Sequence, residues 1–93
     1  PATTQDVCLR VEDDLAYHDL KQMVKDSLRA DERLRVSIRP LDIYKRADDS
    51  SHKQITLSLT LQHHDRTLKT TEVNDILESM VRQISAKTPL ERV

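Results

Sequence analysis

The sequence predicts an α+β fold, in which two helices cover one face of a four-stranded antiparallel sheet. Apolar residues alternate with polar ones in three segments, as they do in half-buried strands, and recur every three to four residues in two others, as they do in amphipathic helices. With a short closing segment, the order is β-α-β-β-α-β. Two helices that carry one apolar stripe each can cover only one face of such a sheet.

The first strand and the first helix are predicted within residues 7–28. Val7, Leu9 and Val11 alternate with Cys8 and Arg10, which indicates a short strand with one buried face. An acidic turn follows. The apolar spacing then changes to one helical stripe between residues 17 and 28, made of Leu20, Met23, Val24 and Leu28.

The second strand is predicted from Leu34 to Tyr44, with an irregularity at its centre. Pro40 has no backbone N–H, so it requires a sheet edge or a bulge. Beyond it the apolar pattern resumes one residue out of phase, at Leu41 and Ile43, which indicates a β-bulge. The charged, Ser-rich residues 45–53 then form the loop of a long hairpin.

The third strand and the second helix have the clearest patterns in the chain. One strand face carries Ile55, Leu57, Leu59 and Leu61, and the other carries Thr56, Ser58 and Thr60. Thr70 or Thr71 is predicted to cap the next helix through its hydroxyl. The apolar stripe of that helix consists of Val73, Ile76, Leu77, Met80, Val81 and Ile84, Pro89 is expected to end it, and residues 90–93 form a candidate last strand.

The composition excludes several classes of protein. The 93 residues correspond to one domain, 1–93, and because the chain starts with Pro1 we expect a fragment of a longer chain. The chain has no Gly, which argues against Gly-rich phosphate loops and dinucleotide fingerprints. Its single cysteine, Cys8, excludes a disulfide scaffold and fits a cytoplasmic setting. No apolar run is long enough to span a membrane.

The face of the sheet that the helices leave uncovered is predicted to be rich in hydroxyls and cationic. Residues 33–69 carry a net charge of +4, between segments of −4 and −1, which indicates an anionic partner or, alternatively, unrelated surface charges. The face lacks the aromatic residues that RNA-recognition sheets stack on bases. It should contain Cys8, Arg10, Arg35, Ser37, Arg39, Thr56, Ser58 and Thr60.

Other polar clusters are interpreted as solvated turns. The His63-His64-Asp65 segment lacks the paired spacing of a zinc site, so no metal is expected. Asp13-Asp14 and Asp48-Asp49 lie in predicted turns without the pocket that a catalytic acid needs. Ser50, Ser51 and His52 have no orienting acid or oxyanion hole, so no catalytic residue is assigned.

With these elements in place, the chain resembles a known family along its whole length. The arrangement is that of the ferredoxin-like fold. The most specific piece is the R-T-L-x-x-x-E-V pattern at Arg66 to Val73. The chain is similar to the ferredoxin-fold anticodon-binding domain that ends the β chain of bacterial phenylalanyl-tRNA synthetase, through "PATTQDVCLRV" (1–11), "LDIY" (41–44), "KQITLSLTLQ" (53–62), "DRTLKTTEVN" (65–74) and "LERV" (90–93).

The chain departs from the family pattern at five positions. Leu41 and Leu61 stand where the family often has Phe, and Gln5 and Gln54 replace the usual Arg and Ser. Arg46 occupies the place of the usual Gly, so the hairpin turn must differ.

The resemblance implies a function. The domain would bind the anticodon stem-loop of tRNA-Phe, while the α subunit of the heterotetramer carries out aminoacylation with ATP and Mg²⁺. The fragment itself would have no cofactor and no catalytic activity. A protein-interaction or small-ligand regulatory domain of the same fold is the alternative, since fold alone does not decide function.

The candidate RNA contacts are five cationic residues. Arg66 and Arg92 occupy positions that match the family, whereas the other three are inferred from the predicted face and the charge distribution. Tyr44 is expected to pack at the base of the hairpin, and Asp42 to accept hydrogen bonds. The full set of candidate contacts is Arg35, Arg39, Arg66, Lys69 and Arg92.

Overall fold

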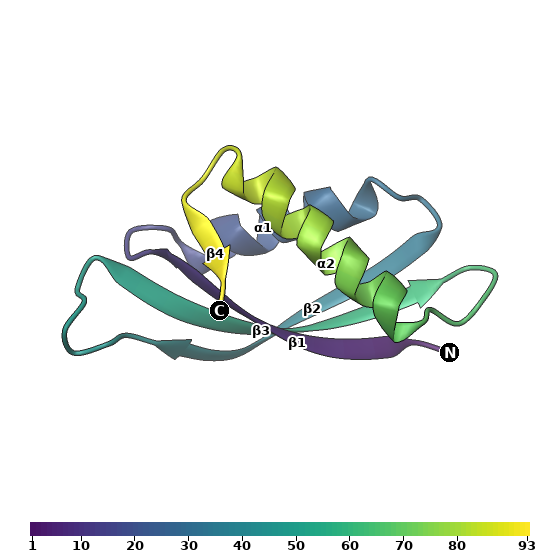
Figure 1. Cartoon of the computed structure of the whole chain (residues 1–93), viewed down its shortest axis with the longest axis horizontal. Coiled ribbons are helices and arrows are strands. Elements are labelled where there is room, and N and C mark those ends of the chain that lie inside the picture. The colour runs from purple at the N-terminus through teal and green to yellow at the C-terminus, as the bar shows by residue number, and fades with distance from the viewer.

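The computed structural model describes all 93 residues and confirms the α+β, ferredoxin-like βαββαβ fold. One four-stranded antiparallel sheet has the strand order β2-β3-β1-β4, and both helices lie over the same face (Figure 1). The elements are β1 (Thr3–Glu12), α1 (Tyr17–Arg29), β2 (Leu34–Tyr44), β3 (His52–His63), α2 (Thr70–Ser85) and β4 (Leu90–Arg92). Neither helix has the length and apolar run that a membrane crossing requires.

The core lies between the sheet and the two helices. β1 and β3 place alternate aliphatic residues opposite one another, such as Val7 beside Leu57 and Leu9 beside Ile55. Full burial of such a side chain contributes about 1.5–3 kcal/mol, so this layer supplies a large share of the hydrophobic stabilisation. The helices close the core with Leu20, Val24 and Leu28 of α1 and Val73, Leu77, Met80 and Ile84 of α2.

The bulge in β2 is confirmed. The register of β2 against β3 shifts between Pro40 and Asp42, so Leu41 is the extra residue. The half of the hairpin beyond this shift extends past the helices (Figure 1). Ile43 lies on the helix side of the sheet, opposite Ile55, yet it is 56% exposed because no helix covers it.

The ends of α2 differ from the prediction. The threonine cap is wrong: the N-cap is Lys69, and the carboxylate of Glu72 accepts the Lys69 backbone N–H at 3.1 Å. The helix ends at Ser85, before Pro89, because the chain turns there and the amides of Lys87 and Thr88 both donate to the carbonyl of Ile84.

Candidate nucleic-acid interface

The sheet face opposite the helices is uncovered, as the sequence predicts (Figure 1). Side chains that point away from the core form rows across the strands, because residues paired in the register share a face. The rows of this open face are Arg35–Gln62, Ser37–Thr60–Thr4, Arg39–Ser58–Asp6, Asp42–Thr56–Cys8, Tyr44–Gln54–Arg10–Glu91 and His52–Glu12.

The prediction that this face is cationic is wrong as a description of the whole face. Its hydroxyl-rich centre is confirmed by Thr56, Ser58 and Thr60. However, the register also places four carboxylates there beside three arginines. The charged residues of the open face are Arg10, Arg35, Arg39, Asp6, Glu12, Asp42 and Glu91.

Arg35 and Arg39 are the two exposed arginines of the open face that make no ion pair. Both lie on β2, an edge strand, so solvent reaches them from the face and from the side. Arg39 and Asp6 flank Ser58 on the central strand, and Ser58 is only 6% exposed. Because the guanidinium groups of Arg35 and Arg39 are exposed and unpaired, they are available to an anionic ligand.

Arg66, in contrast, has an intramolecular partner. Its guanidinium lies 2.6 Å from the Glu72 carboxylate, which also accepts the Lys69 backbone N–H. The Lys69 hydrogen bond, and next to it the hydrogen bond from Arg66, lower the pKa of Glu72. Leu68, two residues after Arg66, and Val73, the residue after Glu72, are both buried. This segment therefore fixes the entry of the chain into α2.

The remaining two candidates lie in different places. Lys69 is exposed at the start of α2 and makes no ion pair. Arg92 is paired with Leu9, so it lies on the helix side of the sheet, where it lines a shallow hollow with Glu78, Val81 and Arg82 of α2. The structure thus groups Arg35 with Arg39 and Arg66 with Lys69, while Arg92 lies apart from both pairs.

Comparison with family models matches residues 1–91 to the ferredoxin-fold anticodon-binding domain. The chain belongs to this family. A comparison with curated proteins gives no significant match. The match covers the sheet, both helices and most of β4, so the open face described above is the open face of an anticodon-binding domain.

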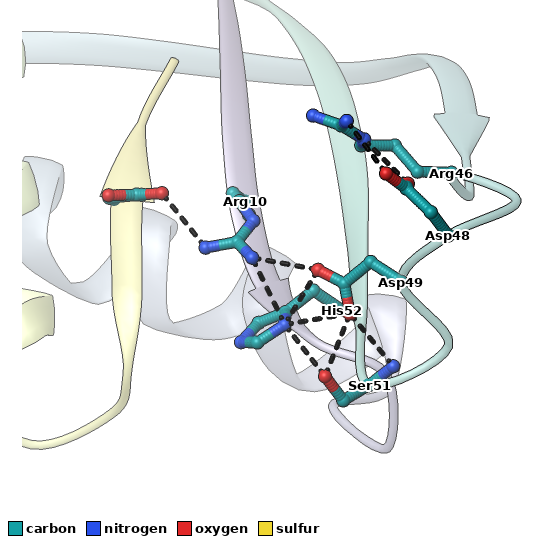
Figure 2. A network of polar contacts seen from close by, with 7 residues as sticks. Arg10, Arg46, Asp48, Asp49, Ser51 and His52 are labelled. Carbon is teal, nitrogen blue, oxygen red and sulfur yellow. Dashed lines mark hydrogen bonds and ion pairs between the residues drawn. The ribbon is translucent and has the colours of Figure 1, made fainter.

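At the hairpin end of this anticodon-binding domain, Arg10 forms a network that the sequence did not indicate (Figure 2). Its guanidinium donates to Asp49 of the hairpin loop at 2.8 Å and to Glu91 of β4 at 3.1 Å. Asp49 also accepts the Ser51 hydroxyl and backbone N–H and lies 3.0 Å from His52 Nδ1. Arg10 therefore ties β1 to the loop and to the last strand.

The network changes the acid–base properties of its members. The hydrogen bond from Arg10, followed by those from Ser51 and His52, holds the pKa of Asp49 well below its usual range. The same contact with Asp49, and then the contact with Glu91, raises the pKa of Arg10. Arg10 is consequently neutralised by two carboxylates and offers little net charge to a ligand.

Tyr44 and Asp42 do not have the structural roles predicted for them. Tyr44 is 53% exposed, because it lies on the open face beside Gln54, and it does not pack at the hairpin base. Asp42 is exposed and accepts no hydrogen bond within the chain. No three His, Cys, Asp or Glu side chains come together as metal ligands would.

Proposed function

We propose that the domain binds tRNA at the anticodon stem-loop through the open face of its sheet. Membership of an anticodon-binding family supports this proposal. The observation that carries it is a sheet face left uncovered by the helices, on which Arg35 and Arg39 have no carboxylate partner. Such free guanidinium groups favour phosphate, which they bind through parallel N–H donors.

We further propose that this domain is the C-terminal part of a phenylalanine-tRNA ligase β chain in the cytoplasm. In this proposal the tRNA is tRNA-Phe, and the α subunit performs aminoacylation with ATP and Mg²⁺. The domain adds RNA contacts and needs neither a cofactor nor catalytic residues of its own. Lys69 and Arg66 would extend the contact at the start of α2, and Arg92 would join only if RNA passed beyond β4.

The proposal is tested by titrating the chain with tRNA over a series of salt concentrations. The net charge of −1 predicts weak binding that is lost at moderate salt. Each phosphate neutralised should lower log K by about 0.7–0.9 per tenfold increase in salt. Binding that does not depend on salt, or no binding at low ionic strength, would contradict direct RNA contact.

A protein-interaction domain is the second candidate, and one observation favours it. The hairpin beyond the bulge exposes three large apolar residues, Leu41, Ile43 and Tyr44, at 45%, 56% and 53%. If protein contact is the main function, Leu41→Ser with Tyr44→Ser should disrupt assembly of the parent protein, whereas Arg35→Glu with Arg39→Glu should leave its tRNA affinity unchanged.

A further inference from the structure

Formal charge changes along the open face, from the start of β2 to the hairpin loop. In the first two rows, Arg35–Gln62 and Ser37–Thr60–Thr4, Arg35 is the only charged residue. In the third row, Arg39 and Asp6 stand on either side of Ser58.

The opposite end of the face is acidic. Its rows contain Asp42, Glu91 and Glu12, and their one arginine, Arg10, is paired with Asp49 and Glu91. Successive rows are about 6–7 Å apart, so the acidic end begins more than one Debye length from Arg35 at physiological salt, about 8 Å. An anionic chain is therefore attracted at the Arg35 end and repelled at the hairpin end.

The Arg35 end also has a hollow with polar walls. It has a volume of about 300 Å³ and is lined by Arg35, Gln62, His63 and His64, with no apolar residue. The side chains of Arg35, Gln62 and His64 are exposed and have no hydrogen-bond partner in the chain. The backbone under His64 is fixed, because its N–H donates to the carbonyl of Arg33 at 3.0 Å.

His63 also lines this hollow, although its side chain lies on the helix side of the sheet, because it is paired with buried Leu34. Its side chain is nine-tenths buried, and its Nδ1 accepts the Asp65 backbone N–H at 3.1 Å. In the neutral ring the proton therefore lies on Nε2, and this buried donor has no partner in the protein. His63 also lines the adjacent hollow around Arg66, but that hollow contains the carboxylates of Asp31, Glu72 and Asp75 and three apolar side chains, so it does not favour an anion.

We propose that this hollow binds one phosphodiester group of the RNA backbone, with Arg35 as its main donor and the Gln62 amide and His64 as further contacts. The inference rests on the proposed function and specifies where on the open face the RNA lies. The RNA backbone then passes along the open face at the start of β2, from Arg35 toward Arg39, and the hairpin end stays free of RNA.

Two probes test the proposal on the 93-residue chain: uridine monophosphate, followed by backbone amide shifts in NMR, and tRNA, followed by affinity against salt. The nucleotide should shift the amides of residues 35 and 62–64 and leave residue 44 unchanged. Arg35→Ala should abolish those shifts, weaken tRNA binding at low salt about tenfold, and reduce the salt slope by about one unit.

Arg46→Ala is the matched control, because it removes the same charge from an arginine at the hairpin end that is paired with Asp48. It should leave both readouts unchanged. Circular dichroism should confirm that both variants are folded, since both residues are exposed.

The outcomes separate the two claims. If tRNA binds with salt dependence but Arg35→Ala and Arg46→Ala weaken it equally, the tRNA function stands and the phosphate site is refuted. If the nucleotide shifts residues 35 and 62–64 but tRNA does not bind, the site stands and the tRNA function is refuted. If neither probe binds, both claims are wrong.

Discussion

Single arginines in this domain differ in function according to the partner that each one meets. Arg10, Arg33, Arg46 and Arg66 each bind a carboxylate of the chain, whereas Arg35 and Arg39 bind none. A paired arginine has little charge left for a ligand, so charge counts along the sequence overstate the basic surface. The neutralised arginines hold loops and helix ends, and Arg35 and Arg39, the two unpaired arginines of the open face, are the strongest candidates for RNA contact.

At this scale, Asp49 should make stability depend on acid pH. Its pKa is depressed in the folded chain, so it stabilises the fold above its unfolded pKa of about 3.9, and this contribution is lost as pH falls through the folded value. Thermal unfolding between pH 6 and pH 2 should show that Asp49→Asn is less stable than the wild type at pH 6 and that this difference shrinks in acid.

The matched control is Asp48→Asn, because Asp48 pairs only with exposed Arg46 in the same loop. It should change the thermal midpoint little at any pH. An Asp49→Asn variant with the same midpoint as the wild type at pH 6 would show that the network does not stabilise the hairpin.

Among the elements, β3 determines the stability of the fold, because it is a central strand paired with both β1 and β2. Leu57 is fully buried on its core side. Leu57→Ala should cost about 2–5 kcal/mol, and each kcal/mol lowers the thermal midpoint by about 4–8 °C in a domain of this size. Urea unfolding of the variant measures this cost.

Thr60→Ala is the comparison on the other face of β3. Thr60 is only partly buried and shares a hydrogen bond with Thr4 at 3.1 Å, so its loss should cost well below the cost of Leu57→Ala. Equal costs for the two variants would contradict the one-sided core.

The helices, strands and bulge could be predicted wherever a pattern of neighbouring residues in the sequence indicates them. The two-residue period gave the strands, and the phase slip at Pro40 gave the bulge. The start of α2 was not predictable from the preference of threonine for helix caps, because the carboxylate of Glu72 accepts the backbone N–H of Lys69, which makes Lys69 the N-cap, one residue before Thr70. The exposure of Ile43 depends on how far the hairpin extends past the helices, which no local pattern encodes.

Over the whole molecule, sequence reasoning recovered which face is open but not its charge. Asp6 and Glu91 reach that face through cross-strand register, and Arg10 meets partners 39 and 81 residues away. Such pairings are set by topology, so the acidic end of the face became visible only in three dimensions.

In the proposed parent enzyme, the two unpaired arginines of the open face should affect tRNA binding and not amino-acid activation. Arg35→Glu with Arg39→Glu should raise KM for tRNA by tenfold or more, since two phosphate contacts become repulsive, and should leave amino-acid activation unchanged. Steady-state aminoacylation and pyrophosphate exchange measure the two quantities. An unchanged KM for tRNA would refute these two contacts.

The hairpin that extends past the helices has a consequence for how the domain opens. The β2 residues beyond the bulge are exposed on both faces, and β2 has only one neighbouring strand, so its hydrogen bonds to β3 there can separate without disturbing the core. The domain should therefore fray from the tip of that arm, and its amide protons should exchange with deuterium long before those of residues 55–61.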